Sequence, residues 1–199
     1  MVRLLILALG AALALLSSAC SLAGEASALP TLGTAPDFAL LDQQGRTFSS
    51  AELRGKTVLV SFIYTSCIDE CPLLSSAMHT AQERLRQDGL LGSKVALLSI
   101  TVDPRRDTVA ALAAYARQFQ ADPDAWRFLT GPPEQVLQVV TGGFKMAAEP
   151  GDASRPGRDI LHSSRVALVD PAGKIRAYFP AAPFDVEGAL RAARLLAKG

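Results

Sequence analysis

The chain of 199 residues is long enough for one domain with a sizeable hydrophobic core. Hydrophobic residues make up 49% of it and charged residues 20%, which is ordinary globular composition. With 20 basic and 19 acidic residues the formal net charge is +1, so the chain lacks the strongly basic character of nucleic-acid-binding proteins and we expect no nucleic-acid partner.

Residues 1–19 are predicted to be a secretory signal. They begin with a single basic residue, Arg3, continue with an apolar run from Leu4 to Leu16, and end in small residues. This pattern is typical of a signal peptide, and the run is shorter than the about 20 residues that cross a bilayer. Its removal leaves 19 basic and 19 acidic residues. We therefore expect the mature protein to have a net charge of zero. The signal also predicts export to the periplasm, where disulfides can persist.

Cys20 directly follows this signal. The preceding residues resemble a bacterial lipobox, in which the cysteine becomes the lipid-modified first residue of a lipoprotein, although Ser17 stands where leucine is usual. The alternative is ordinary cleavage, after Ala19 or after Ala28. In the lipoprotein interpretation, residues 20–34 tether a folded domain of residues 35–199 to the membrane through an N-terminal lipid at Cys20.

The rest of the chain alternates between predicted strands and helices. Continuous apolar runs, such as 57–64 and 94–102, are typical of strands whose two sheet faces are both covered. Asp107 and Thr108 are the expected capping residues of one helix. Pro, Gly and charged residues at 149–158 indicate an exposed loop. The expected strands are 35–42, a short return strand within 43–48, 57–64, 94–102, 127–130, 164–169 and 174–179. The expected helices are 72–87, 107–119, 133–141 and 185–197, with a short helical turn at 50–54.

This order predicts an α/β fold of the thioredoxin-like class. A hairpin before the first buried strand and an extra helix in the middle favour the larger, peroxiredoxin-like variant, with a central sheet covered by helices on both faces. In such sheets the functional site lies at the carboxyl ends of the strands. We therefore expect it where the first buried strand, 57–64, meets the helix that follows.

Cys67 and Cys71 stand at that junction. Four residues of helix advance about 6 Å, which lies within the Cα separation of about 4.4–6.8 Å that a disulfide tolerates. The same spacing lets both sulfurs face one metal ion, and a helix N-terminus stabilises thiolates. Three interpretations remain open: a redox dithiol, a soft-metal site, or a structural disulfide that would close only a short loop and stabilise little.

A metal site would need a further ligand. Two thiolates and one imidazole suit copper, because thiolates prefer Cu(I) and imidazole also serves Cu(II), whereas zinc would normally need a fourth ligand. The chain has two histidines. His79 follows Cys71 by eight residues on the same predicted helix, about 12 Å along its axis, which is too far. His162 precedes the predicted strand 164–169, and its spacing alone leaves a structural role and a ligand role both open.

Three motifs occur in one order along the chain, and together they resemble the Sco/SenC family of copper chaperones. They are Tyr64-Thr65-Ser66-Cys67-Ile68-Asp69-Glu70-Cys71-Pro72, Val102-Asp103-Pro104-Arg105-Arg106-Asp107-Thr108, and His162 ahead of Val169-Asp170-Pro171-Ala172-Gly173-Lys174. The family often has proline after the first cysteine and an apolar residue before the second, where this chain has Ile68 and Glu70. Asp103 is either a supporting residue near the site or a turn residue.

The resemblance implies a function. Cys67, Cys71 and His162 would bind one copper ion, as Cu(I) or Cu(II), and the protein would help to assemble the dinuclear copper site of cytochrome c oxidase. Its partner would be the copper-bearing subunit of that oxidase or another periplasmic copper carrier. The alternative is a thiol–disulfide oxidoreductase, in which Cys67 and Cys71 form the catalytic pair that reduces the target's cysteines before metal loading.

Overall fold

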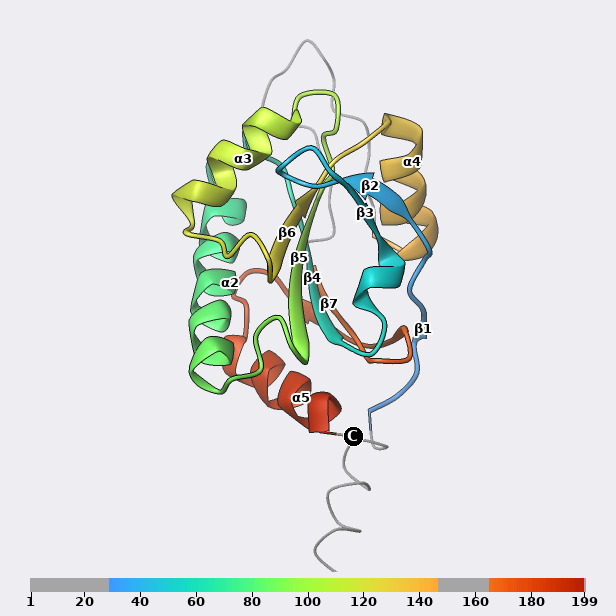
Figure 1. Ribbon diagram of the computed structural model, residues 1–199, viewed down its shortest axis with the longest axis vertical. Coiled ribbons are helices and arrows are strands. Elements are labelled where there is room, and N and C mark those ends of the chain that lie inside the picture. Colours follow the sequence, from blue (N-terminus) through green and yellow to red (C-terminus); the bar gives the residue numbers. More distant parts are fainter. Residues whose placement is uncertain (1–28, 147–164, 199) are drawn as a thin grey trace, which may run out of the picture.

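The structure is a computed structural model that describes residues 29–146 and 165–198. Its centre is a six-stranded mixed sheet in the order β1-β8-β7-β4-β5-β6 (Figure 1). The strands β4, β5 and β6 are parallel, whereas β7 is antiparallel to both β4 and β8. The bounds are β1 Gly33–Thr34, β4 Thr57–Ile63, β5 Val95–Thr101, β6 Trp126–Leu129, β7 Arg165–Val169 and β8 Lys174–Pro180.

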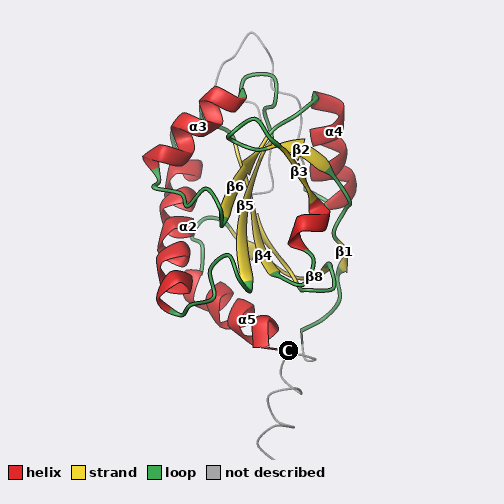
Figure 2. Ribbon diagram, viewed as in Figure 1, coloured by secondary structure: helices red, strands yellow, loops and turns green. Residues whose placement is uncertain are grey.

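Helices cover both faces of this sheet, as the sequence predicted (Figure 2). One face packs against α2 (Glu70–Gln87), α3 (Val109–Gln118) and α5 (Val186–Lys198). The other packs against α4 (Pro133–Leu137), which continues as a π-helix over Gln138–Gly143, and against the hairpin of β2 (Ala39–Leu41) and β3 (Thr47–Ser49). A 3₁₀ turn at Ser50–Leu53 follows that hairpin.

The central strand β4 contributes side chains to the hydrophobic cores on both faces of the sheet. All seven of its residues are buried, and alternate side chains enter opposite cores. Leu59 and Ile63 lie in the core beneath α2, whereas Val58, Val60 and Phe62 lie in the core beneath α4. Each such side chain contributes about 1.5–3 kcal/mol on burial, so β4 is a rigid support for the turn that follows it.

Most boundaries differ from those expected by one or more residues, and three of the differences affect the site or the extent of the fold. Helix α2 begins at Glu70 rather than Pro72, which brings Cys71 into its first turn, where the missing N–H of Pro72 costs little. The cap of α3 is Thr108 alone, whose side chain accepts the Ala111 N–H at 3.2 Å. Strand β1 pairs with β8 through residues expected to lie at the end of the tether, so the folded part includes residues before Ala35.

In the described ranges 29–146 and 165–198, no helix combines the length and the apolar character needed to span a bilayer.

We predict that Gly143→Ala destabilises the fold. A Cβ at this position would come within 2.6 Å of Pro36 Cβ, and Pro36 belongs to the segment that leads from β1 into the hairpin. We expect a loss of about 1–3 kcal/mol in the free energy of unfolding, which lowers Tm by about 2–4 °C per kcal/mol. The matched control is Gly142→Ala, whose Cβ would meet Gln138 at an ordinary 3.8 Å. Equal Tm values for the two variants would contradict the prediction.

Candidate metal centre

The turn between β4 and α2 holds Cys67 and Cys71 at the carboxyl end of the sheet, at the junction predicted from the sequence. The Cys67 N–H donates to the Tyr64 carbonyl at 3.2 Å, which closes the turn at the end of β4. Cys67 is 8% exposed and Cys71 is 2% exposed, and both belong to the core cluster that includes Leu74 and Met78 of α2. The two cysteines thus lie at the outer edge of a rigid core, and packing against that core fixes their positions.

Both cysteines are free thiols, and they are joined by a hydrogen bond. The Cys71 N–H donates to Cys67 Sγ at 3.4 Å. Asp69 is the N-cap residue of α2, yet its side chain makes no capping bond. The sulfur of Cys67 therefore accepts one of the N–H groups that a helix N-terminus leaves without a partner. This N–H and the helix dipole both favour a thiolate at Cys67.

The surroundings drive the pKa values of the two thiols apart. Burial raises the pKa of Cys67, but hydrogen bonds from the Cys71 backbone, the Cys71 thiol and Tyr64 outweigh burial and bring this pKa below its ordinary value. Burial raises the pKa of Cys71 far above its ordinary value, and the hydrogen bond from the Tyr64 backbone offsets only part of the rise. The negative charges of Cys67 and Glu70 add to it. Of the two thiols in the apo pair, Cys67 therefore ionises first and Cys71 keeps its proton to higher pH.

We predict that an alkylating reagent distinguishes the two thiols. In the reduced, metal-free protein near pH 7, iodoacetamide should modify Cys67 at least about tenfold faster than Cys71, because only thiolates react and Cys67 is also the less buried sulfur. Peptide mass spectrometry over a pH series measures both rates. Cys71→Ala removes the thiol donor and should move the Cys67 profile to higher pH, whereas equal rates at the two cysteines in the wild type would contradict the assignment.

A buried carboxylate in the segment between β5 and α3 supports this turn. Asp107 is fully buried and accepts three hydrogen bonds: from the Thr65 N–H at 3.1 Å, from Thr65 Oγ1 at 2.5 Å and from Thr101 Oγ1 at 2.5 Å. It thereby ties the segment after β5 to the turn that precedes Cys67. Burial raises the pKa of Asp107, although the hydrogen bonds from Thr101 and Thr65 act in the opposite direction.

This role of Asp107 was not predicted. Asp107 and Thr108 were both candidates for the cap of α3, of which only Thr108 is confirmed, and Asp103 was considered as the supporting residue. Asp103 instead pairs with Arg106 at 3.1 Å, and its N–H donates to Thr101 Oγ1 at 2.9 Å. The available signal was the pair of threonines, Thr65 and Thr101, at the ends of two adjacent parallel strands, where a third polar group between them would be buried.

Besides the two cysteines, the described residues contain no predicted ligand, and His79, which its spacing excludes from the site, makes no metal site with them. His79 lies on α2, partly buried, and its Nδ1 is buried without a hydrogen-bond partner. In this part of the chain no three side chains among His, Cys, Asp and Glu gather to form a metal site. Cys20 and His162 lie outside the described residues. Strand β7, which begins three residues after His162, pairs with β4.

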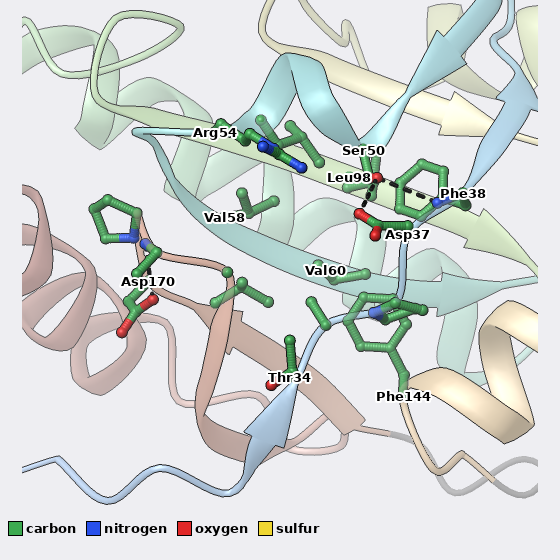
Figure 3. A pocket seen from close by; sticks show the side chains of 17 residues that line it. Thr34, Asp37, Phe38, Ser50, Arg54, Val58, Val60, Leu98, Phe144 and Asp170 are labelled. Atoms are coloured by element: carbon green, nitrogen blue, oxygen red, sulfur yellow. Dashed lines mark hydrogen bonds between the residues drawn. The ribbon is translucent and has the colours of Figure 1, made fainter.

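A hollow of about 430 Å³ lies on the face of the sheet that packs against α4, opposite the face that holds the cysteines (Figure 3). Val58 and Val60 form its floor, and Asp37 and Arg54 stand at its rim. Ser50 Oγ donates to Asp37 at 3.3 Å and accepts the Phe38 N–H at 3.2 Å. The residues that line this hollow include neither cysteine nor histidine, so it offers no soft-metal ligands. The thiol pair beneath the opposite face is the candidate site.

Comparison with known proteins agrees with this geometry. The SCO1/SenC family model matches residues 27–196. A SCO2-like protein of Rickettsia felis is 37% identical over 145 residues, which cover 72% of this chain and 67% of the relative. The structure of Bradyrhizobium japonicum ScoI with copper bound superposes with a TM-score of 0.65 at 28% identity, over 82% of this chain and 99% of ScoI.

A further solved structure supports the fold. BsSco, described as a member of the Sco family of cytochrome c oxidase assembly proteins, superposes with a TM-score of 0.72 at 24% identity. The alignment covers 84% of this chain and 95% of BsSco. At this identity the likeness speaks for the fold alone. The comparisons confirm both the predicted thioredoxin-like class and the resemblance stated from the three sequence motifs.

Proposed function

Since this chain belongs to the SCO1/SenC family, we propose that it is a copper chaperone that binds one copper ion through Cys67, Cys71 and His162. The observation that carries the proposal is the pair of reduced thiols at the start of α2. Both are sulfur donors of the kind that Cu(I) prefers, and they are fixed to one rigid strand–helix junction. The copper-bound state of the related ScoI supports copper as the cargo.

The protein's own residues would do distinct jobs in copper binding. The thiolate of Cys67 is the first donor, because its pKa is the lower of the two. Cys71 must release its proton as the metal binds, so binding should release about one proton per chain from this pair. Asp107 holds the turn in place through Thr65 before copper arrives. Three protein donors leave one coordination position for a ligand of the receiving protein.

His162 is proposed as the third ligand on the strength of chain direction. Ala167 of β7 pairs with Val60 of β4, and the strands are antiparallel. Arg165 at the start of β7 therefore lies toward the end of β4 that leads to Cys67. Three residues separate Arg165 from His162, a reach of at most about 10 Å.

We further propose an exported, lipid-anchored protein on the periplasmic side of the membrane. Residues 1–19 would be removed as the signal, Cys20 would carry the lipid, and the residues between it and β1 would form the tether. The receiving partner would be the copper-bearing subunit of cytochrome c oxidase or another periplasmic copper carrier, a proposal supported by the assembly role stated for BsSco. Mass spectrometry of the mature protein should find a diacylated Cys20, and an N-terminus beyond Cys20 would refute the anchor.

A second function, thiol–disulfide exchange, is favoured by the unequal pKa values of the two cysteines. The Cys67 thiolate would attack a target disulfide, form a mixed disulfide and release one target thiolate. Cys71, after losing its proton, would attack Cys67 Sγ and release the second target thiolate. The products are a reduced target and a Cys67–Cys71 disulfide. This step could precede copper delivery to the same target.

A copper titration of the reduced mature protein tests the proposed function. We expect one copper per chain, and a sulfur-to-metal charge-transfer band when Cu(II) is added. The His162→Ala variant then separates the two functions. Loss of copper transfer with disulfide reduction intact supports the chaperone, whereas disulfide reduction by a wild type that transfers no copper supports the oxidoreductase.

A further inference from the structure

Two exposed apolar side chains lie close to the cysteines in the sequence, one before Cys71 and one after it. Ile68 is 87% exposed and Leu73 is 69% exposed, and they are the two most exposed large hydrophobic residues in the ranges that the structure describes. Ile68 lies between the two cysteines in the sequence, and Leu73 lies in the first turn of α2. The next most exposed, Leu32 at 52% and Leu137 at 41%, lie on other elements.

Packing among residues 29–146 and 165–198 does not account for the exposure of these two side chains. The core face of α2 is formed by Leu74, Met78, Ala81 and Leu85, none of them more than 3% exposed, so Leu73 is on the other side of the helix. With Asp69 as N-cap, Ile68 and Leu73 occupy the N′ and N4 positions, the spacing of a hydrophobic staple. A closed staple would bury much of both side chains, whereas these remain largely in solvent.

The charges near this patch are acidic. Asp69 and Glu70 are both exposed and lie between Ile68 and Leu73 in the sequence. The chain from residue 57 to residue 83 contains neither lysine nor arginine. The segment 57–83, which carries both sulfurs, is therefore apolar with negative charge, and its complement is an apolar surface bordered by basic side chains.

We propose that Ile68 and Leu73 form the surface on which the copper-receiving protein docks, and that this partner presents metal-ligating side chains within an apolar face bordered by lysine or arginine. The proposal rests on the proposed function. Copper can pass directly between two proteins only if the ligands of the partner reach the metal held by Cys67 and Cys71. The side chains that flank these sulfurs must then lie within the contact, and exposed apolar residues stabilise such contacts most when water is excluded.

The test uses the copper-loaded mature protein and, as probe, the apo form of the soluble copper-bearing domain of a bacterial cytochrome c oxidase. The variants are Ile68→Ser, Leu73→Ser and the double variant, and the control is Leu137→Ser on α4, beneath the other face of the sheet. Copper content is measured first, followed by affinity for the probe and by the copper content of the probe after reisolation. We expect each single variant to bind copper normally and to bind the probe roughly 5- to 30-fold more weakly.

The affinity of the wild type should also fall as ionic strength rises, because the acidic residues of the patch would meet basic ones. Wild-type affinity and copper transfer in the double variant would overturn the proposal while leaving the chaperone function intact. It would also be overturned by a wild-type protein that sediments as a dimer and becomes monomeric in the double variant, because the patch would then join two copies of this chain. Failure of the wild type to bind copper before the probe is added would overturn the proposed function, and the docking surface with it.

Discussion

Cys67→Ser and Cys71→Ser should each reduce bound copper from one equivalent per chain to near zero when a competing chelator sets the free copper concentration. The two sulfurs supply the soft donors, and serine oxygen is a poor substitute for thiolate toward Cu(I). Loss of a residue that merely supports a ligand costs about 10- to 100-fold in metal affinity, so loss of a ligand itself should cost at least about 100-fold. The measurement is a Cu(I) competition titration against a chromophoric chelator.

The two histidines provide a matched comparison for this prediction. His162→Ala should weaken copper binding as a cysteine substitution does, whereas His79→Ala should bind copper like the wild type, because His79 lies on α2 eight residues beyond Cys71. Proton release recorded during the wild-type titration should come mainly from Cys71, because this thiol keeps its proton to higher pH than Cys67. Unchanged copper affinity in His162→Ala would remove that residue from the ligand set and leave a site of two sulfurs.

The elements that the sequence predicted best are those with continuous apolar runs. Strands β4 and β5 were expected at 57–64 and 94–102 and are found at Thr57–Ile63 and Val95–Thr101. Their uninterrupted runs of buried residues depend only on both faces being covered, which the alternating helices guarantee. The position of the thiol pair follows directly, because the end of a buried strand and the start of its helix fix where Cys67 and Cys71 lie.

Features that depend on contacts between distant segments were not predictable in this way. Strand β1 has only two residues, Gly33 and Thr34, and forms because β8, some 140 residues later, offers a free edge. The role of Asp107 likewise requires β4 and β5 to be adjacent and parallel, so that Thr65 and Thr101 both reach it. Local propensity assigns an aspartate at this position to a helix cap. The tertiary contacts instead bury it.

Asp107→Ala should be strongly destabilising, with a loss of about 2–4 kcal/mol in the free energy of unfolding measured in urea. The substitution leaves the Thr65 N–H, its hydroxyl and the Thr101 hydroxyl without their acceptor, and each unpaired buried donor costs about 1–3 kcal/mol before relaxation. Thr101→Val removes one of these donors and serves as the partner in a double-mutant cycle. Because the two side chains share a hydrogen bond, the double variant should be less destabilised than the sum of the single variants.

Asp107→Asn removes the ionisable carboxyl group and keeps a side chain of nearly the same shape. Burial raises the pKa of Asp107 above that of the unfolded chain, so the native state holds its proton to higher pH. Between the unfolded and the folded pKa the native state binds more protons, and the contribution of Asp107 to stability is therefore full in acid and is lost as pH rises through the folded pKa. Asparagine has no such dependence. The stability difference between wild type and Asp107→Asn should thus be largest at low pH and shrink as pH rises, in urea unfolding at a series of pH values. A difference that grows with pH would mean that the hydrogen bonds from Thr65 and Thr101 stabilise the ionised carboxylate more than burial penalises it.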